Sequence, residues 1–329
     1  MLRNPMTLMD ATGQINDQVA LSFAQSNLSY IEQGIYRTRY PTFDYARHVP
    51  VDTEGNQWQA SSTWYAMDTQ GEAKFISGQS TDIPFVGMTR NQFNAPVYMI
   101  GSGWTWNIEE LNQAAIAGVN ISAELPATSR RVVERKLYDI AMVGTTEKGA
   151  GFTGLINDGT VTSYTVAATG TGSSTFWSNK TPDQILFDVN TLLGGIPTAT
   201  NNVEQADTLR LPPSAFRYLS STRLGTNGDS ITILEFLRLN NIYTAETQQP
   251  LDIGTIQELE TAGASGDGRM IAYRRSPEVV RFKLPMPFTI LPVRSRSILS
   301  YEAAGIARTG GTQIRLPGAV RYADRITDG

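Results

Sequence analysis

Side chains that could carry out chemistry are few in this chain and lie far apart. Cysteine is absent, which excludes disulfides, thiolate metal sites and cysteine nucleophiles. His48 is the only histidine, so the usual general base is available at one position only. Glu109 and Glu110 are adjacent in a segment with helical spacing, so their carboxylates point in different directions and do not form an i, i+4 metal pair.

Two glycine-rich segments resemble phosphate-binding loops only in part. Gly263–Gly268 (GASGDG) lacks the Lys-Ser/Thr pair and the following helix that such a loop needs. Residues 170–174 (GTGSS) lack a third glycine and a strand-turn-helix setting. We interpret both as surface turns. No His-rich metal motif, Gly-x-Ser-x-Gly elbow or Ser-x-x-Lys motif is present. The sequence therefore predicts no catalytic residues, no cofactor and no metal, and a chain that is not an enzyme.

Residues 51–86 predict a long polar ribbon of two strands. Polar side chains alternate at period two with Trp58, Ala60 and Trp64, which is strand spacing. Asp68–Gly71 predicts the turn, after which Glu72–Ile76 returns beside the first strand. An isolated two-stranded hairpin is marginally stable in water, and both tryptophans would lie largely exposed. The ribbon therefore needs another surface, and if a neighbouring subunit supplies it, the function of the chain is assembly.

The elements before and after the ribbon follow from apolar spacing. Leu21, Leu28 and Ile35 belong to a stripe that predicts a helix over residues 18–36, within an arm, and Tyr40-Pro41 ends it. Residues 43–51 are expected to form a strand that contains His48 as an ordinary strand residue.

A long helical segment follows the ribbon. Residues 88–106 predict a strand, and helical spacing from Ile108 ends at Gly118. A second apolar face runs from Pro126, a natural helix start, to Gly144. Either one long helix is broken between residues 120 and 126, or two helices follow each other.

The rest of the chain mixes helices and strands. Thr181 and Gln184 predict a helix start, and Gly194-Gly195 its end. Further helices are expected from Pro212-Pro213 and from a cap at Ser230, with short strands between them. From Phe288 onward the pattern is almost entirely strand, and we expect these strands to return to the first domain.

Charge is nearly balanced overall but unevenly placed along the 329 residues. Residues 269–329 contain eleven Lys or Arg and four Asp or Glu, a net charge of +7, and since the whole chain carries −4, residues 1–268 carry −11. Either the basic end meets an acidic partner, which would be the front half of a neighbouring subunit or nucleic-acid phosphates, or these charges lie on the solvated faces of strands. No signal peptide and no bilayer-spanning apolar run is recognisable, so we expect a soluble chain made inside a cell.

Several segments together resemble a known family. Their order is an arm, YRTRYPTFDYARHVPVD, the polar ribbon, DIPFVG, WNIEELNQAAIAGVN, a long charged helix, and VGTTEKGAGFTGLIND. This order resembles the major capsid proteins of tailed bacteriophages, in the branch that includes encapsulin-like shells. The most informative part is Gly151–Asn157 (GFTGLIN), which in that family joins the long helix to the next domain.

The resemblance implies an α+β fold with five parts: an N-terminal arm, an extended β-hairpin loop, a long spine helix, a peripheral domain and an axial domain. The arm corresponds to residues 1–39 and the extended loop to 51–86. The peripheral domain takes 40–50, 87–150 and 284–329, and the axial domain takes 151–283.

The resemblance also implies that arm and loop lie over adjacent subunits. Some shells of this type are cross-linked by an isopeptide bond between a loop lysine and a neighbour's asparagine, and Lys74 is the lysine of the loop here, although no Asn or Glu can be assigned to that role. We expect intersubunit contacts from residues of the extended loop and the arm, namely Trp58, Trp64, Tyr65, Lys74, Phe75, Phe23 and Ile31.

The function implied is a virion shell built from hexamers and pentamers of this chain around double-stranded DNA, which it contacts without sequence specificity. Portal, scaffolding and decoration proteins are further expected partners, no membrane is involved, and assembly is expected in the host cytoplasm. The alternative within the same fold is an encapsulin-like compartment that holds a cargo enzyme. A phage-associated hydrolase or adhesin is a third hypothesis, which the shortage of His, Cys and convergent acid pairs makes the weakest.

Overall fold

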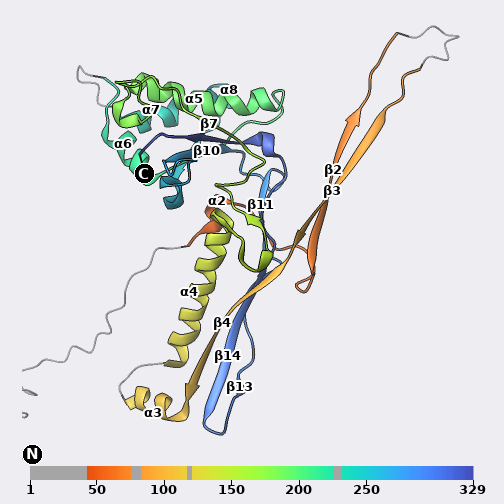
Figure 1. The fold of residues 1–329 in the computed structure, drawn as a ribbon, viewed down its shortest axis with the longest axis vertical. Coiled ribbons are helices and arrows are strands. Elements are labelled where there is room, and N and C mark those ends of the chain that lie inside the picture. The colour runs from red at the N-terminus through yellow and green to blue at the C-terminus, as the bar shows by residue number, and fades with distance from the viewer. Residues whose placement is uncertain (1–42, 76–82, 117–120, 226–230, 329) are drawn as a thin grey trace, which may run out of the picture. The chain divides into compact units, whose positions relative to one another are not determined.

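The computed structural model describes residues 43–75, 83–116, 121–225 and 231–328, which form a mixture of helices and strands (Figure 1). The arm and its expected helix lie outside the described residues. Most of the buried apolar side chains belong to one cluster, which joins the long helix to the largest sheet.

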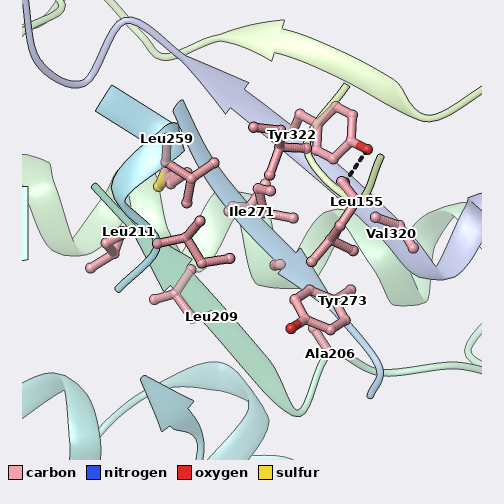
Figure 2. Packing of buried hydrophobic residues seen from close by; sticks show 14 of the residues in the cluster. Leu155, Ala206, Leu209, Leu211, Leu259, Ile271, Tyr273, Val320 and Tyr322 are labelled. Carbon is pink, nitrogen blue, oxygen red and sulfur yellow. Dashed lines mark hydrogen bonds between the residues drawn. The ribbon is translucent and has the colours of Figure 1, made fainter. Parts of the chain in front are cut away.

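The largest sheet has five strands in the order β7-β16-β10-β8-β9. Its middle strand, β10, is buried at every position and pairs antiparallel with β16 and β8. Figure 2 shows Leu209, Ile271 and Tyr322, from three neighbouring strands, packed together in the core, and the Tyr322 hydroxyl donates to the Leu155 carbonyl at 2.6 Å. The strands are β7 (Thr162–Thr165), β8 (Thr208–Leu211), β9 (Asp252–Thr255), β10 (Arg269–Tyr273) and β16 (Val320–Asp324).

Helix α5 (Pro182–Ala199) packs against β10 and β16. Its predicted start is confirmed, because Thr181 and Gln184 form a reciprocal capping box. Its predicted end at Gly194-Gly195 is wrong, and the helix continues to Ala199. Gly195 is buried where the Arg321 guanidinium crosses the helix, and an added Cβ would overlap that group, so this glycine allows a close approach. The neighbouring helices are α6 (Pro213–Ser221), α7 (Ile233–Leu239) and α8 (Ile242–Thr247).

A buried ion pair fixes the loop before α5. Lys180 Nζ lies 2.6 Å from Asp188 Oδ2, and the Trp177 indole N–H donates to the same oxygen at 3.0 Å. Burial raises the pKa of Asp188, although the bonds from Lys180 and Trp177 act against it. The pair therefore ties the loop to α5 at the cost of removing two charges from water.

Two helices follow each other where either one or two were expected. They are α3 (Ile108–Ile116) and α4 (Ile121–Met142). Pro126 lies inside α4, so its predicted role as the helix start is wrong. The expected apolar face of α4 is confirmed, since Val133 and Leu137 are buried in the core.

Helix α4 lies against a second sheet (Figure 1). Strands β4 (Tyr98–Asn107) and β14 (Ser300–Thr309) pair antiparallel along their full length, and the Ser129 hydroxyl of α4 donates to the Ser102 carbonyl at 3.0 Å. β14 also pairs with β12 (Met286–Ile290) and β13 (Arg294–Ser295).

Smaller elements connect these sheets. Strands β1 (Val51–Asp52), β11 (Val280–Lys283) and β15 (Gly311–Ile314) form one sheet, and β5 (Gly144–Thr145) pairs with β6 (Phe152–Thr153). The 3-10 helices are η2 (Glu147–Gly149), η3 (Trp177–Asn179), η4 (Gln257–Glu260) and η5 (Pro317–Ala319).

Two expectations about the ends of the described chain are wrong. Residues 43–51 do not form a strand: Tyr45–His48 forms the short helix α2, because the Asp44 side chain accepts a hydrogen bond from the Arg47 N–H at 3.2 Å. The last strands do not all return to the first domain. β14 pairs with β4, but β16 completes the five-stranded sheet, where its side chains are mostly buried.

His48 ends α2 in a buried position, with 8% of its surface exposed. Its backbone carbonyl accepts a hydrogen bond from the Tyr273 hydroxyl at 2.7 Å, which joins α2 to the five-stranded sheet. Burial first, and then the nearby cations Arg210 and Arg47, lower the pKa of His48 to about 4.

We predict that protonation of His48 destabilises the fold as the pH falls. The unfolded chain binds this proton near pH 6.5 and the folded chain only near pH 4, so stability rises with pH between these values. The free energy of unfolding should drop by about 2 kcal/mol from pH 7 to pH 5. Chemical denaturation at both pH values checks this, and His48→Gln should remove most of the difference. An equal drop in both proteins would contradict it.

Candidate intersubunit surfaces

The extended ribbon is present, but with different strands from those predicted. β2 (Ser61–Gln70) and β3 (Gly87–Pro96) pair antiparallel through ten residues each and form a sheet of only two strands (Figure 1). The predicted turn at Asp68–Gly71 is therefore wrong, since β2 continues to Gln70. The predicted return at Glu72–Ile76 is wrong as well: Glu72 to Phe75 carry no strand, and Ile76 lies outside the described residues. The observed ladder forms twice as many residue pairs as the short hairpin would, which outweighs the local turn signal.

The register gives the ribbon two different faces. On one face Trp64 lies opposite Phe93, and their rings stack with centroids 5.7 Å apart. The Arg315 guanidinium lies 5.5 Å from the Trp64 ring centroid, which connects this face to the strand region after β15. Trp64 is therefore half-buried, and the expectation that it would be largely exposed is wrong.

The opposite face of the ribbon is exposed and carries large apolar side chains among polar ones. Tyr65, Met67 and Met88 project from it with exposed fractions of 51%, 66% and 67%. Arg90 lies over the Tyr65 ring at 3.5 Å and covers part of it. In the described parts of the connection between the strands, Phe75, Ile83, Phe85 and Val86 are exposed as well. Exposed apolar side chains that gather on one surface mark interaction sites in soluble proteins.

Only some of the residues that were predicted to make intersubunit contacts lie on the same surface. Trp58 precedes β2 and is 64% exposed beneath the Arg308 guanidinium. Tyr65 lies on the exposed face, and Lys74 and Phe75 are exposed beyond the end of β2. Phe23 and Ile31 lie outside the described residues. Met67 and Met88 were not among the predicted residues. Met67 lies two residues after Tyr65, so period-two spacing could have indicated it, whereas Met88 reaches the same face through its pairing opposite Thr69, which the sequence does not encode.

A cluster of opposite charges holds the root of the ribbon. Asp52, at the end of β1, is paired with Arg281 and lies 3.1 Å from Lys283 Nζ. Lys283 also donates to the Glu54 carbonyl at 2.6 Å, and Arg308 donates to the Gln57 carbonyl at 2.7 Å. Burial raises the pKa of Asp52. The hydrogen bond from the Glu54 N–H and the charges of Lys283 and Arg281 lower the pKa by more than burial raises it, so the pKa lies below its ordinary value.

Many of the basic side chains of the C-terminal segment form ion pairs within the chain. Arg274 pairs with Glu204, and Arg281 and Lys283 with Asp52, which all cross the boundary between the basic end and the acidic front part. Arg325 pairs with Asp267 at 3.0 Å, and Arg269 pairs with Asp324. Arg294 and Arg296 remain exposed on the segment between β12 and β14.

The residues considered for chemistry have structural roles where they are described. Glu110 Oε2 accepts the Asn107 N–H at 3.2 Å while Asn107 Oδ1 accepts the Glu110 N–H at 2.6 Å, so this carboxylate caps α3. The Gly263–Gly268 segment closes as a turn, with the Gly263 N–H donating to the Asp267 carbonyl at 2.8 Å. Among the described residues, no group of three or more acidic or histidine side chains is placed to hold a metal ion. None of the described helices is both long and apolar enough to cross a bilayer.

Comparison with known proteins decides the family. The family model described as major capsid protein matches residues 71–326. This chain belongs to the major capsid protein family. It is therefore a structural subunit of a capsid, and it associates with copies of itself in a virion.

Solved phage structures show the same fold. The capsid of Myoviridae phage XM1 superposes with a TM-score of 0.75 at 18% identity, covering 92% of this chain and 98% of that one. A chain from Microbacterium phage Oxtober96 gives a TM-score of 0.63 at 12% identity, covering 95% and 99%. A chain from Mycobacterium phage Bobi gives 0.60 at 13% identity, covering 92% and 97%. Among curated protein sequences, none is similar enough to this chain to count as a match.

We predict that the charge of Asp52 is needed to hold the ribbon root. Asp52→Asn keeps an acceptor for the Glu54 N–H but leaves Arg281 and Lys283 without their counter-charge, so the free energy of unfolding should fall by about 3 kcal/mol. Denaturant titration checks this. Glu147→Gln is the matched control, because Glu147 is largely exposed and its partner Lys136 partly so, and it should change stability by less than about 0.5 kcal/mol. Equal effects of the two substitutions would contradict the role of Asp52.

Proposed function

We propose that many copies of this capsid subunit assemble as hexamers and pentamers into a closed icosahedral shell that encloses double-stranded DNA. The observation that carries the proposal is the β2-β3 ribbon, which exposes Tyr65, Met67 and Met88 on its outer face and forms no sheet with other described strands. A two-stranded sheet is marginal in water by itself, so surface from a neighbouring subunit would stabilise it. Because the chain belongs to the major capsid protein family, copies of the same chain are the expected neighbours.

The division of the subunit into domains is proposed with corrected boundaries. The peripheral part contains α4 and the β4-β14 sheet, and the axial part is built on the five-stranded sheet, to which β16 belongs. The extended loop reaches from residue 51 to Pro96 instead of ending at residue 86, since β3 is its second strand. The arm, residues 1–39, remains a prediction for contacts with adjacent subunits.

The other partners follow from the same proposal. A shell filled by DNA needs a portal for its entry, and scaffolding or decoration proteins are further candidates. Contact with the packaged DNA would be non-specific, through charges such as Arg294 and Arg296. Assembly would take place in the host cytoplasm before the subunit becomes part of the virion.

Simple observations test the two remaining hypotheses, an encapsulin-like compartment and a cross-link through Lys74. An encapsulin-like compartment would be indicated by a neighbouring gene for a peroxidase or ferritin-like cargo, whereas terminase, portal and tail genes indicate a virus. Cross-linking through Lys74 would give ladders of covalent multimers on denaturing electrophoresis of mature particles. A single band near 36 kDa would exclude the cross-link.

We predict that one charge on the apolar face of the ribbon prevents assembly without unfolding the subunit. Met67→Asp changes an exposed side chain, so the free energy of unfolding should change by less than about 0.5 kcal/mol. Shells should be lost, because the interface would have to remove the new carboxylate from water together with Arg90, which lies directly opposite residue 67. Negative-stain microscopy and thermal denaturation measure the two effects.

The matched control for this variant is Asn91→Asp. It adds the same charge to the other face of the same ribbon, opposite Ala66, and should allow shells to form. Shells at the wild-type yield from Met67→Asp would refute the role of the apolar face.

A further inference from the structure

An apolar cavity of about 220 Å³ lies between α3, the start of α4 and the strands β4, β12 and β14. Every described residue that lines it is apolar or aromatic, and the walls include Trp104 and Trp106 from β4 and Leu111 from α3. Ile290 and Val293 also line the cavity and are themselves about half exposed. The cavity is therefore open to solvent, and its walls suit an apolar side chain.

The turn between β13 and β14 presents such a side chain beside α3. Ile298 lies in this turn and is 91% exposed, so it does not fill the cavity of its own subunit. The Arg296 N–H closes the turn by donating to the Ser300 carbonyl at 2.9 Å. The Ile108 N–H donates to the Leu299 carbonyl at 3.0 Å, which joins the turn to the start of α3. The turn and one wall of the cavity are therefore held together within the subunit.

The turn and the helix beside the cavity carry opposite charges. Residues 290–299 contain Arg294 and Arg296 and no acidic residue, which gives a net charge of +2. Residues 98–116 contain Glu109 and Glu110 and no Lys or Arg, which gives −2. Arg294 lies opposite Glu302 in the β13-β14 pair, so Arg296 is the cation nearest to Ile298 that faces no acid across the strands. Opposite charges of this kind favour and orient contacts between proteins.

The exposed apolar side chains of the ribbon lack this complementarity. Residues 61–96 contain three acidic and two basic residues, a net charge of −1, which is the same sign as that of α3. The basic turn that carries Ile298 therefore suits the surroundings of the cavity better than the ribbon does.

We propose that Ile298 of one copy of the chain enters the apolar cavity of a second copy, with Arg296 facing the acidic start of α3. The proposal rests on the shell function proposed above, and it names a contact separate from that of the ribbon. Each copy presents both the turn and the cavity, so the contact is heterologous: a copy donates its turn to one neighbour and accepts the turn of another. Contacts of this type close into a ring when the rotation between copies allows it, as around a symmetry axis of a closed shell.

Two exposed isoleucines provide a matched pair of substitutions. Ile298→Ala removes most of the side chain that enters the cavity, so the subunit concentration needed for particle assembly should rise by about tenfold or more. Ile116→Ala is the control, and it should leave this concentration unchanged. Ile116 is 89% exposed and lies five residues after Leu111 in α3, on a different face of the helix. Light scattering measures assembly, and thermal denaturation of dilute subunits should give the same melting temperature for both variants and the unsubstituted chain.

A charge reversal tests which surfaces meet. Arg296→Glu places a carboxylate against the acidic start of α3 and should raise the concentration needed for assembly. Adding Glu110→Lys to this variant exchanges the two charges and should restore most of the assembly, while Asn107 Oδ1 still accepts from the backbone N–H of residue 110. Adding Glu235→Lys instead, at an exposed position of α7, makes the same change of charge elsewhere and should restore nothing.

The outcomes separate this contact from the shell function. If the unsubstituted chain forms no particles, the shell function is overturned and the contact falls with it. If particles form but Ile298→Ala assembles at the same concentration as Ile116→Ala, only the contact is overturned.

Three further results would overturn the contact alone. The first is a lower melting temperature of dilute Ile298→Ala subunits, which would mean that this side chain packs within its own subunit. The second is a failure of Glu110→Lys to restore the assembly of Arg296→Glu. The third is normal assembly of Arg296→Glu with a loss of packaged DNA only, which would mean that the arginine contacts nucleic acid.

Discussion

Backbone hydrogen bonds join β2 and β3 along ten residues each, but two strands provide no further layer to cover their side chains. One face is covered near its root, where Trp64 stacks on Phe93 beneath Arg315. The other face exposes Tyr65, Met67 and Met88 along its length. Because burial of apolar surface is the main driving force for association, a ribbon of this kind gains stability when another subunit covers it. This exposed face is the structural feature on which the proposed assembly depends.

The remainder of the subunit holds the ribbon in place. Asp52, Lys283 and Arg281 fix its entry, and Arg308 holds the segment before β2 through the Gln57 carbonyl. These cations come from the basic C-terminal segment. They bind acidic groups and backbone carbonyls of the same chain. Much of the positive charge of the C-terminal segment is therefore paired within the subunit. Arg294 and Arg296 are exposed and remain available for other contacts.

The sequence predicted those elements whose signals are local. The capping box at Thr181, the apolar face of α4 and the existence of a two-stranded ribbon were all readable, because each depends on neighbouring residues or on a simple period. The ribbon's return strand was misplaced because Asp68–Gly71 has turn chemistry, while the choice of Gly87–Pro96 depends on cross-strand pairing that local spacing does not encode. The place of β16 in the five-stranded sheet and the cluster around Asp52 depend on contacts between distant residues, and these were not predicted.

Backbone amide exchange of β2 and β3 tests the central claim most directly. Hydrogen exchange of residues 61–70 and 87–96 is compared between dilute, unassembled subunits and assembled particles, with the buried strand β10 as the internal reference. We predict rapid exchange of the ribbon in the subunits and strong protection in the particles, while β10 is protected in both. Equal protection of the ribbon in both states would show that the ribbon is stable without a neighbour, which would contradict its dependence on another subunit.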